Sequence, residues 1–302
     1  MIARWFSDAE ARAALGPVYT SSIPIPLISY SRLSDDERAA EVSSIREDLD
    51  TSRRALSGPH RRESWSDAWS ERLAAFERSM YDLAALEPPY VSAHQTVRLL
   101  GDYARSETCQ FETRVYEYIR ESMFRSLMTG FDTIHDVGAG TCFNSAAFCA
   151  LDPSVSVHAY DWAPATSQIA TVLRERYAMN ISGSLFDFYA PDLRPSQDDV
   201  VVTTCAMEQV GESWLPFLEN LLRASPGRVV HLEPIYEKYD ASIEYDRLAA
   251  EYHLSRNYLK GYYPELKRLE AAGKIEILCD HRTGIGSRFH ECYTILAWEA
   301  RR

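Results

Sequence analysis

Residues 131–142 read Phe-Asp-Thr-Ile-His-Asp-Val-Gly-Ala-Gly-Thr-Cys, and this stretch decides the fold. A short apolar strand runs into Asp136, and a glycine turn and a helical pattern follow at once. Gly138 and Gly140 lack the β-carbon that would hold a ligand away from the backbone, and both can adopt positive φ. The stretch therefore predicts a loop that binds an adenosine-containing ligand.

Short apolar segments alternate with helical patterns from residue 131 onward, which is typical of a doubly wound α/β sheet. The predicted strands lie near 132–137, 155–160, 183–187, 199–204, 228–233, 275–280 and 290–298, and the predicted helices near 143–150, 164–178, 213–224 and 244–272. The link between the last two strands is too short for a crossover helix, so it predicts a hairpin. The expected fold class is α/β, with a mostly parallel, Rossmann-like sheet of seven strands whose last strand is antiparallel.

The first 130 residues or so read as helices joined by proline breaks. Ser34 and Glu37 form a capping-box pattern at the start of a helix towards Leu49. Apolar stripes at helical spacing follow, the first of which contains Trp65 and Trp69. Core packing is the simpler interpretation of these tryptophans, and stacking on a ligand is the alternative.

Two regions follow from these patterns. Residues 1–106 are expected to form an N-terminal helical region that serves as a lid, a substrate cover or a dimerisation surface. Residues 107–302 are expected to form the α/β domain, with a helical insertion at about 240–272.

Composition excludes several classes of protein. The chain has 302 residues, 46% of them hydrophobic, and a formal net charge of −12. The basic residues are interspersed with acids, which argues against a nucleic-acid partner, and no apolar run is long enough for a membrane span. We expect a cytoplasmic protein with a small-molecule substrate, and the sequence leaves a homo-oligomer open. Its six cysteines show no CxxC pair and are expected to be reduced thiols: Cys109, Cys142, Cys149, Cys205, Cys279 and Cys292.

A second acidic residue supports the nucleotide site. Asp161 ends the second predicted strand, about 20 residues after the glycine turn, where a carboxylate can accept hydrogen bonds from both ribose hydroxyls. Trp162 beside it can cover an adenine face. An NAD-dependent dehydrogenase shares these features. Its dinucleotide-binding loop, however, requires a third glycine at the position of Phe143, and the Asp136 carboxylate would repel a diphosphate. A cationic ligand suits the carboxylate better.

The region from residue 111 to the C-terminus resembles the class I S-adenosylmethionine-dependent methyltransferases. The loop 136–141 resembles the first motif of that family, although Cys142 stands where a third glycine is common. The resemblance implies a strand order of 3-2-1-4-5-7-6, S-adenosylmethionine as cofactor, and an acid with an apolar neighbour at the adenine site after strand three. The implied cofactor-binding residues are Asp136, Gly138, Gly140, Asp161, Trp162, Asp187, Phe188 and Thr203.

Each carboxylate also has a plainer interpretation. Asp161 can cap the helix that begins near Pro164, and Asp187 can begin the turn towards Pro191. Only their occurrence in order at successive strand ends favours the ligand.

Methyl transfer from a sulfonium is an in-line displacement that depends mainly on positioning. The strand ends that share the crevice edge offer Glu208 and His290 as catalytic candidates, and no spacing indicates a metal. The expected acceptor is a small polar metabolite, methylated at oxygen or nitrogen. A dehydrogenase and a non-catalytic cofactor-binding regulatory module remain alternatives. The candidates for binding the acceptor are Gln209, Glu233, Tyr236, His281, Arg288 and Tyr262.

Overall fold

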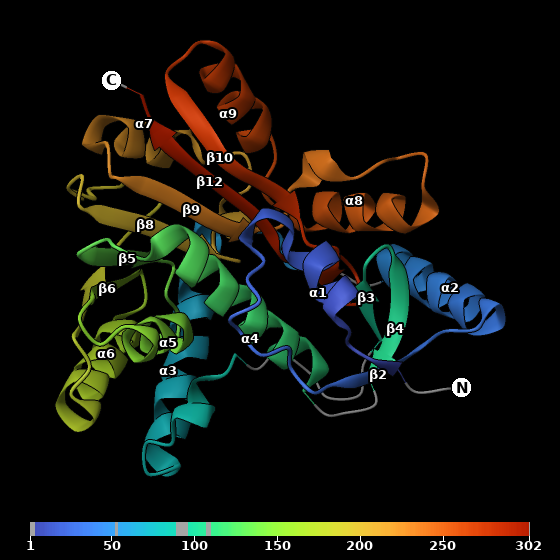
Figure 1. Ribbon diagram of the computed structural model, residues 1–302, viewed down its shortest axis with the longest axis horizontal. Coiled ribbons are helices and arrows are strands. Elements are labelled where there is room, and N and C mark those ends of the chain that lie inside the picture. The colour runs from blue at the N-terminus through green and yellow to red at the C-terminus, as the bar shows by residue number, and fades with distance from the viewer. Residues whose placement is uncertain (1–3, 52–53, 89–95, 107–109, 302) are drawn as a thin grey trace.

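The computed structural model describes residues 4–51, 54–88, 96–106 and 110–301, whose strands form two sheets (Figure 1). The larger sheet has seven strands in the order β10-β12-β9-β8-β5-β6-β7. Every neighbouring pair is parallel except the two pairs that involve β12. The order 3-2-1-4-5-7-6 and the antiparallel last strand are therefore confirmed. The strands are β5 (Thr133–Val137), β6 (Ser156–Asp161), β7 (Ile181–Leu185), β8 (Asp199–Thr204), β9 (Arg228–Glu233), β10 (Ile275–Arg282) and β12 (Thr294–Ala300).

Helices cover both faces of this sheet, because its central strands are apolar on both sides. In β8, Val200 and Val202 join one buried cluster while Val201 joins another. The first cluster includes α4 (Phe111–Met123), α5 (Phe143–Leu151) and α6 (Pro164–Tyr177), and the second includes α7 (Leu215–Ala224) and α9 (Tyr262–Ala271). Side chains buried on both faces explain why the central strands read as continuous apolar runs.

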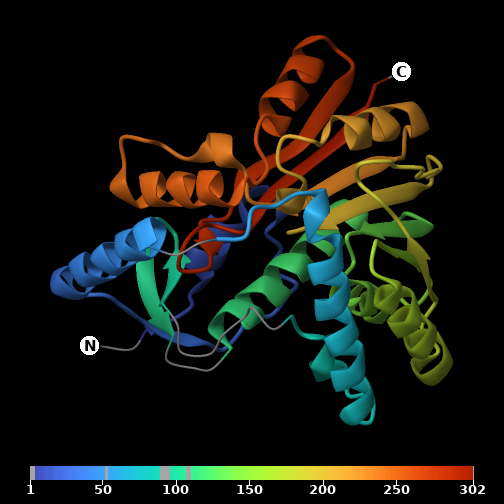
Figure 2. The same ribbon diagram turned by 180° about the vertical axis from the view of Figure 1, so that it is seen from behind.

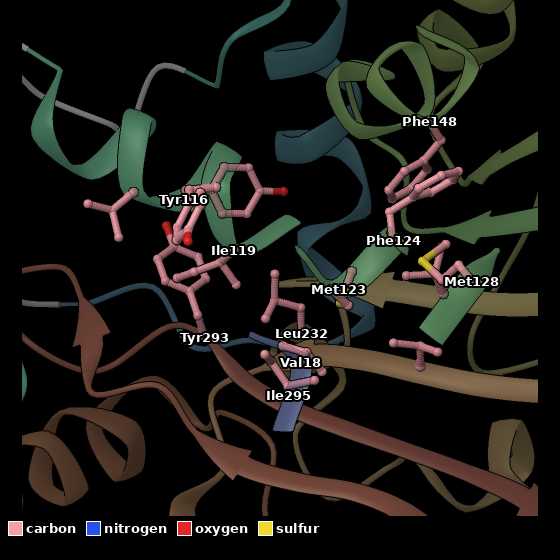
Figure 3. Close-up of a cluster of buried hydrophobic side chains, with 14 of the residues drawn as sticks. Val18, Tyr116, Ile119, Met123, Phe124, Met128, Phe148, Leu232, Tyr293 and Ile295 are labelled. Atoms are coloured by element: carbon pink, nitrogen blue, oxygen red, sulfur yellow. The ribbon is translucent and has the colours of Figure 1, made fainter. Parts of the chain in front are cut away.

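The close packing of α4 on the sheet is shown in Figure 3. Ile119 and Met123 of α4 share one buried cluster with Leu232 of β9 and Ile295 of β12. A single turn of π-helix, Phe124–Met128, continues α4 towards β5 and buries Phe124 against the α5 side chains. This packing fixes the sheet beneath the glycine loop that follows β5.

The expected helix at 244–272 is two helices, α8 (Glu244–Arg256) and α9. Asn257 ends α8 in the left-handed conformation at φ 54°, and Gly261 precedes α9 at φ 84°. The carbonyl of Lys260, between them, accepts a hydrogen bond from the Trp214 indole at 2.7 Å. The prediction of one helix was wrong because asparagine and glycine at these positions break the helix locally. No helix in the described parts of the chain is long and apolar enough to cross a membrane.

The N-terminal region contains more than helices, which corrects the expectation. It has α1 (Asp8–Leu15), α2 (Asp35–Thr51) and α3 (Arg62–Arg78), and also four strands: β1 (Arg4–Trp5), β2 (Ser29–Arg32), β3 (Thr96–Leu99) and β4 (Asp102–Ser106). Leu100 and Gly101 join β3 to β4 with φ of 52° and 82°, the positive values of a tight hairpin turn. The capping box at Ser34 and Glu37 is confirmed at the start of α2.

The small sheet ties the two ends of the chain together. Its order is β1-β2-β4-β3-β11, and β11 (Ile285–Gly286) comes from the segment between β10 and β12. The strand expected at 290–298 begins only at Thr294. Ahead of it, Glu291 forms an isolated bridge with Gly286 of β11, and β11 itself pairs with β3. Consequently α2, α8 and the small sheet lie side by side beyond one edge of the large sheet (Figures 1 and 2).

Short one-turn helices complete the described chain. They are η1 (Gly16–Val18), η2 (Pro59–Arg61), η3 (Leu83–Leu86), η5 (Met207–Val210) and η6 (Tyr236–Lys238).

Candidate functional site

A cavity of about 700 Å³ opens at the carboxyl ends of the large sheet. One part lies over the glycine loop and the ends of β6 and β7, and we call it the nucleotide half. The other part lies between the loop after β8, the end of α8 and residues 287–293, and we call it the acceptor half. The carboxyl ends of parallel strands are where ligands bind in sheets of this kind.

The glycine loop forms the floor of the nucleotide half. Gly138 has φ of 82°, and its N–H donates to the Tyr160 carbonyl of β6 at 2.7 Å. A β-carbon built on Gly138 would lie 2.3 Å from the β-carbon of Ala206 in the loop after β8. Glycine is therefore required here by both backbone conformation and space. Cys142, where a third glycine is common, takes φ of 58°, so cysteine occupies a left-handed position.

Asp161 lines the cavity and also fastens its floor. One carboxylate oxygen accepts from the Gly140 N–H and the other from the Ala163 N–H, both at 2.9 Å. Asp161 does not cap α6, because the N-cap Ala163 has no side-chain cap bond, but its carboxylate holds the turn just before that helix. The second lone pair of each oxygen remains for a ligand. Burial raises the pKa of Asp161 to about 6. Trp162 lines the cavity beside it.

Asp136 does not line the cavity. Its side chain is buried beneath α5, where it accepts a hydrogen bond from the Ser145 hydroxyl at 2.5 Å. Burial raises its pKa to about 6, against the lowering effect of Ser145. Asp136 therefore joins β5 to α5 and acts on the cavity through the loop it supports.

Asp187 also lies outside the cavity lining. Its carboxylate pairs with Arg62 of α3 and accepts from the Tyr189 N–H at 2.9 Å. This is the arrangement expected of a turn residue. The neighbouring Phe188 does line the cavity, edge-to-face with Phe186 at 5.3 Å between ring centroids. The side of the nucleotide half after β7 is thus aromatic.

Two tryptophans of α3 cover the nucleotide half. Trp65 and Trp69 stack on each other at 5.3 Å, and both line the cavity. A β-carbon built on Gly140 would lie 3.0 Å from the Trp69 ring. Sequence reasoning favoured core packing for both residues, because their four-residue spacing gives the same signal in either role.

Glu208 and Gln209 line the acceptor half on the loop after β8. Glu208 is buried and accepts from the Gln209 amide at 2.7 Å. Burial and the nearby charge of Glu233 raise the pKa of Glu208 to about 8. Glu233 does not line the cavity: its carboxylate accepts from the N–H groups of Ala206 and Met207 at 3.0 and 3.1 Å. It holds the loop that presents Glu208.

His290 and Arg288 line the acceptor half from the segment after β11. His290 is buried, and its Nδ1 lies 3.0 Å from Nε2 of His253 in α8. Burial lowers the pKa of His290 well below its ordinary value. The Arg288 guanidinium is engaged by Glu41 and Asp48 of α2.

Four other candidates lie away from the cavity lining. Thr203 and Tyr262 both contact the His231 ring, at 2.9 and 2.8 Å, in the interior of the sheet. His281 lies against α1, with Nε2 3.1 Å from the Ala13 carbonyl oxygen. Tyr236 is outside the lining as well, in η6, below the Lys260 ammonium. Strand position alone could not separate these side chains from those that reach the cavity.

Several lining residues of the acceptor half were not predicted. Arg256 ends α8, and Glu112 begins α4, where its carboxylate accepts from the Tyr293 hydroxyl at 3.2 Å. Tyr252 of α8 and Tyr258, just after that helix, also line this half. Their signal is the clustering of aromatic hydroxyls at residues 252–263.

Across the residues that the structure covers, no group of three His, Cys, Asp or Glu side chains is arranged to hold a metal ion. Cys109 lies outside the described residues, and the other five cysteines are free thiols.

Comparisons with known proteins were made for both sequence and structure. No family model matches the sequence, and no curated protein matches it. Similar solved structures include LaPhzM, at 17% identity and a TM-score of 0.43 over 63% of this chain. Others are a SAM dependent methyltransferase from Aquifex aeolicus (17% identity, TM-score 0.44, 63% of this chain and 94% of that one) and the riboflavin-derivative dimethyltransferase RosA from Streptomyces davawensis (14%, 0.47, 89% and 71%).

The match covers 58% of the LaPhzM chain, so this protein spans less than two thirds of it. Values of this size describe a partial likeness in fold. The function has to be inferred from the residues of the cavity.

Proposed function

We propose that this protein is a methyltransferase that moves a methyl group from S-adenosylmethionine to oxygen or nitrogen of a small molecule. The observation that carries the proposal is one continuous cavity with two unlike halves. The nucleotide half has a glycine floor and the Asp161 carboxylate, which suit a ribose and a nearby cation. The acceptor half has polar and aromatic side chains from distant segments.

The division of the cavity into a nucleotide half and an acceptor half fits an in-line displacement. With the nucleoside over the glycine loop, the sulfur would face the loop after β8, and an acceptor in the other half would approach the methyl group from behind. The cavity is covered by α3 on one side and by residues 287–293 on the other. A site covered on two sides supports a small acceptor. Glu208 is the candidate base for a hydroxyl acceptor, since its carboxyl group lines the acceptor half.

Phe143 argues against a dinucleotide. It is the first residue of α5, it lines the cavity, and the Arg120 guanidinium lies 4.7 Å from its ring centroid. A diphosphate rests on a helix N-terminus of this kind, and the phenyl ring stands there instead.

The test is calorimetry of the purified protein with S-adenosylhomocysteine and, separately, with NAD. Binding of the first and not the second is expected, and the reverse would overturn the proposal. Methyl-labelled S-adenosylmethionine incubated with a metabolite mixture should then yield labelled product. Binding of S-adenosylhomocysteine without any turnover would favour a non-catalytic cofactor-binding module.

A further inference from the structure

Among the residues that the structure describes, the acceptor half contains one cationic side chain that forms no ion pair. Arg256 and Arg288 are the cationic side chains among the described residues that line the cavity. Arg288 is bound to Glu41 and Asp48. Arg256 forms no ion pair with any residue that the structure describes, and its Nε is buried without a hydrogen-bond partner there. A half-buried guanidinium without an anionic partner, on the wall of a cavity, is a ready site for an anion.

The backbone of Arg256 is held in place. Its carbonyl accepts from the Ser57 N–H at 2.8 Å, and the Asn257 amide donates to the Ser57 carbonyl at 3.1 Å. Ser57 also donates from its hydroxyl to Gln209 at 3.0 Å. The guanidinium lies 5.2 Å from the Tyr258 ring centroid. The backbone of Arg256 is thus fixed before any ligand arrives, and the Tyr258 ring contacts its guanidinium, which reduces the entropy lost on binding.

His290 presents a second hydrogen-bond donor. The Tyr239 hydroxyl donates to the Glu291 carbonyl at 3.3 Å, so its oxygen is left to accept from Nε2 of His253 at 3.4 Å. The same Nε2–H of His253 donates to Nδ1 of His290, 3.0 Å away. The opposite arrangement would leave an N–H on the buried Nδ1 of His253, for which the described residues offer no acceptor.

Because both rings are buried and burial lowers their pKa values, each carries a single proton. His290 therefore keeps its proton on Nε2, 3.5 Å from the Cys292 sulfur, which also lines the cavity. This assignment makes His290 a donor and leaves the role of base to Glu208.

The carboxyl groups of this half form no ion pair with Arg256 in the described chain, although its charge has a lowering effect on the pKa of Glu208. Burial raises the pKa of Glu208 to about 8, so it is mainly protonated at neutral pH. Glu112 receives the Tyr293 hydroxyl. The wall itself is aromatic, and its Tyr252 and Phe289 rings stack on each other at 4.9 Å with 11° between their planes.

This inference rests on the proposed methyl transfer. We infer that the acceptor is a planar aromatic molecule carrying a carboxylate. It is bound through Arg256 and the Nε2–H of His290, and it stacks along the wall of Tyr252 and Phe289. The carboxylate would accept from both donors, and the ring would lie between that anchor and the transferable methyl group.

The test is a panel of one- and two-ring hydroxylated aromatic carboxylates, each beside its uncharged carboxamide, titrated calorimetrically into the full chain loaded with S-adenosylhomocysteine. At least one carboxylate should bind about ten-fold or more tightly than its amide, the size of effect of a charge-assisted contact. Arg256→Gln should reduce that ratio below about threefold. Arg247→Gln is the matched control, because this arginine is on the same helix and lies outside the cavity lining, with its side chain 43% exposed. Its ratio should stay at the wild-type value.

Equal binding of acid and amide throughout the panel, or a ratio that survives Arg256→Gln, would overturn the inference. Arg256→Lys, which keeps the charge, should retain part of the preference and guards against misfolding of the first variant. The titrations are repeated without S-adenosylhomocysteine. A protein that binds carboxylates more tightly than amides but does not bind S-adenosylhomocysteine would overturn the proposed function and leave the inference about the carboxylate standing. Nitrogen-15 spectra should find the proton of His290 on Nε2, and a proton on Nδ1 would contradict its role as donor.

Discussion

The two halves of the cavity are built in different ways. The nucleotide half comes mainly from consecutive strand ends, with Gly138 and Asp161 within 25 residues of each other along the chain. The acceptor half joins Glu112, Arg256 and His290, which come from α4, α8 and the segment before β12. One half is a local motif supported by a sheet, and the other exists only when distant segments pack. Substitutions should therefore separate cofactor binding from acceptor binding and turnover.

The largest difference between the effect on turnover and the effect on cofactor binding is expected for Glu208→Gln. Replacing the candidate base should lower the rate of methyl transfer to a hydroxyl acceptor by about 10²–10⁴-fold while S-adenosylhomocysteine affinity stays unchanged. Because burial raises the pKa of Glu208 to about 8, its ionised fraction grows with pH, so the wild-type rate should rise through about pH 8. Initial rates measured from about pH 6 to about pH 10 test this. A wild-type rate in the variant would make Glu208 structural only.

A smaller effect, confined to the nucleotide half, is expected for Gly138→Ala. The added methyl group would meet Ala206, and the residue must hold φ of 82°, so S-adenosylhomocysteine binding should weaken by about 2–3 kcal/mol. Gly130→Ala is the control, since Gly130 also has positive φ but no atom within 4 Å of an added β-carbon. Calorimetry and thermal melting of both variants give the comparison. Equal losses of affinity in the two would show that backbone strain, and not the shape of the floor, was measured.

Asp161→Asn should weaken the same binding by about 1–2 kcal/mol, because an amide replaces a carboxylate that serves both the loop and the ribose. The pKa of about 6 gives a second readout: as pH falls through about 6 the wild-type carboxylate is neutralised, and affinity should fall with it. Asp187→Asn is the control, since its side chain pairs with Arg62 outside the lining. A loss for Asp187→Asn as large as for Asp161→Asn would restore the expected adenine role of Asp187.

The smallest change is expected for Arg62→Ala. The Arg62 side chain is 52% exposed and Asp187 30%, so this ion pair between α3 and the turn after β7 should contribute under about 1 kcal/mol to stability. Thermal melting and S-adenosylhomocysteine titration should both stay near wild type. A loss of affinity without a loss of stability would show that α3 closes over the nucleotide half through this pair.

The difference between the halves also explains what the sequence could predict. Strands 199–204 and 228–233 were placed correctly, because runs such as Val200 to Val202 are buried on both faces by neighbours in the same α/β repeat. Strands β1 to β4 were missed, since they are two to five residues long and belong to a sheet completed by β11 from the far end of the chain. Short strands of this kind carry little local signal.

The site divides in the same way. Gly138 and Asp161 could be found from spacing, because a turn that admits a ligand restricts its residues. Arg256 could not, since an arginine at the end of a helix is usually a solvated side chain. Only the contact of Ser57 with its carbonyl and the burial of its Nε mark it as part of a site. Trp69 was ambiguous for a similar reason, as core and ligand-covering faces share one helical spacing.

The most direct test of the two-part cavity is a crystal structure of the protein with S-adenosylhomocysteine bound. The account predicts the ribose hydroxyls at the Asp161 carboxylate, the adenine near Trp162 and Phe188, and the sulfur turned towards Glu208 and the acceptor half. A nucleoside bound with its ribose away from Asp161, or with its sulfur directed out of the acceptor half, would contradict it.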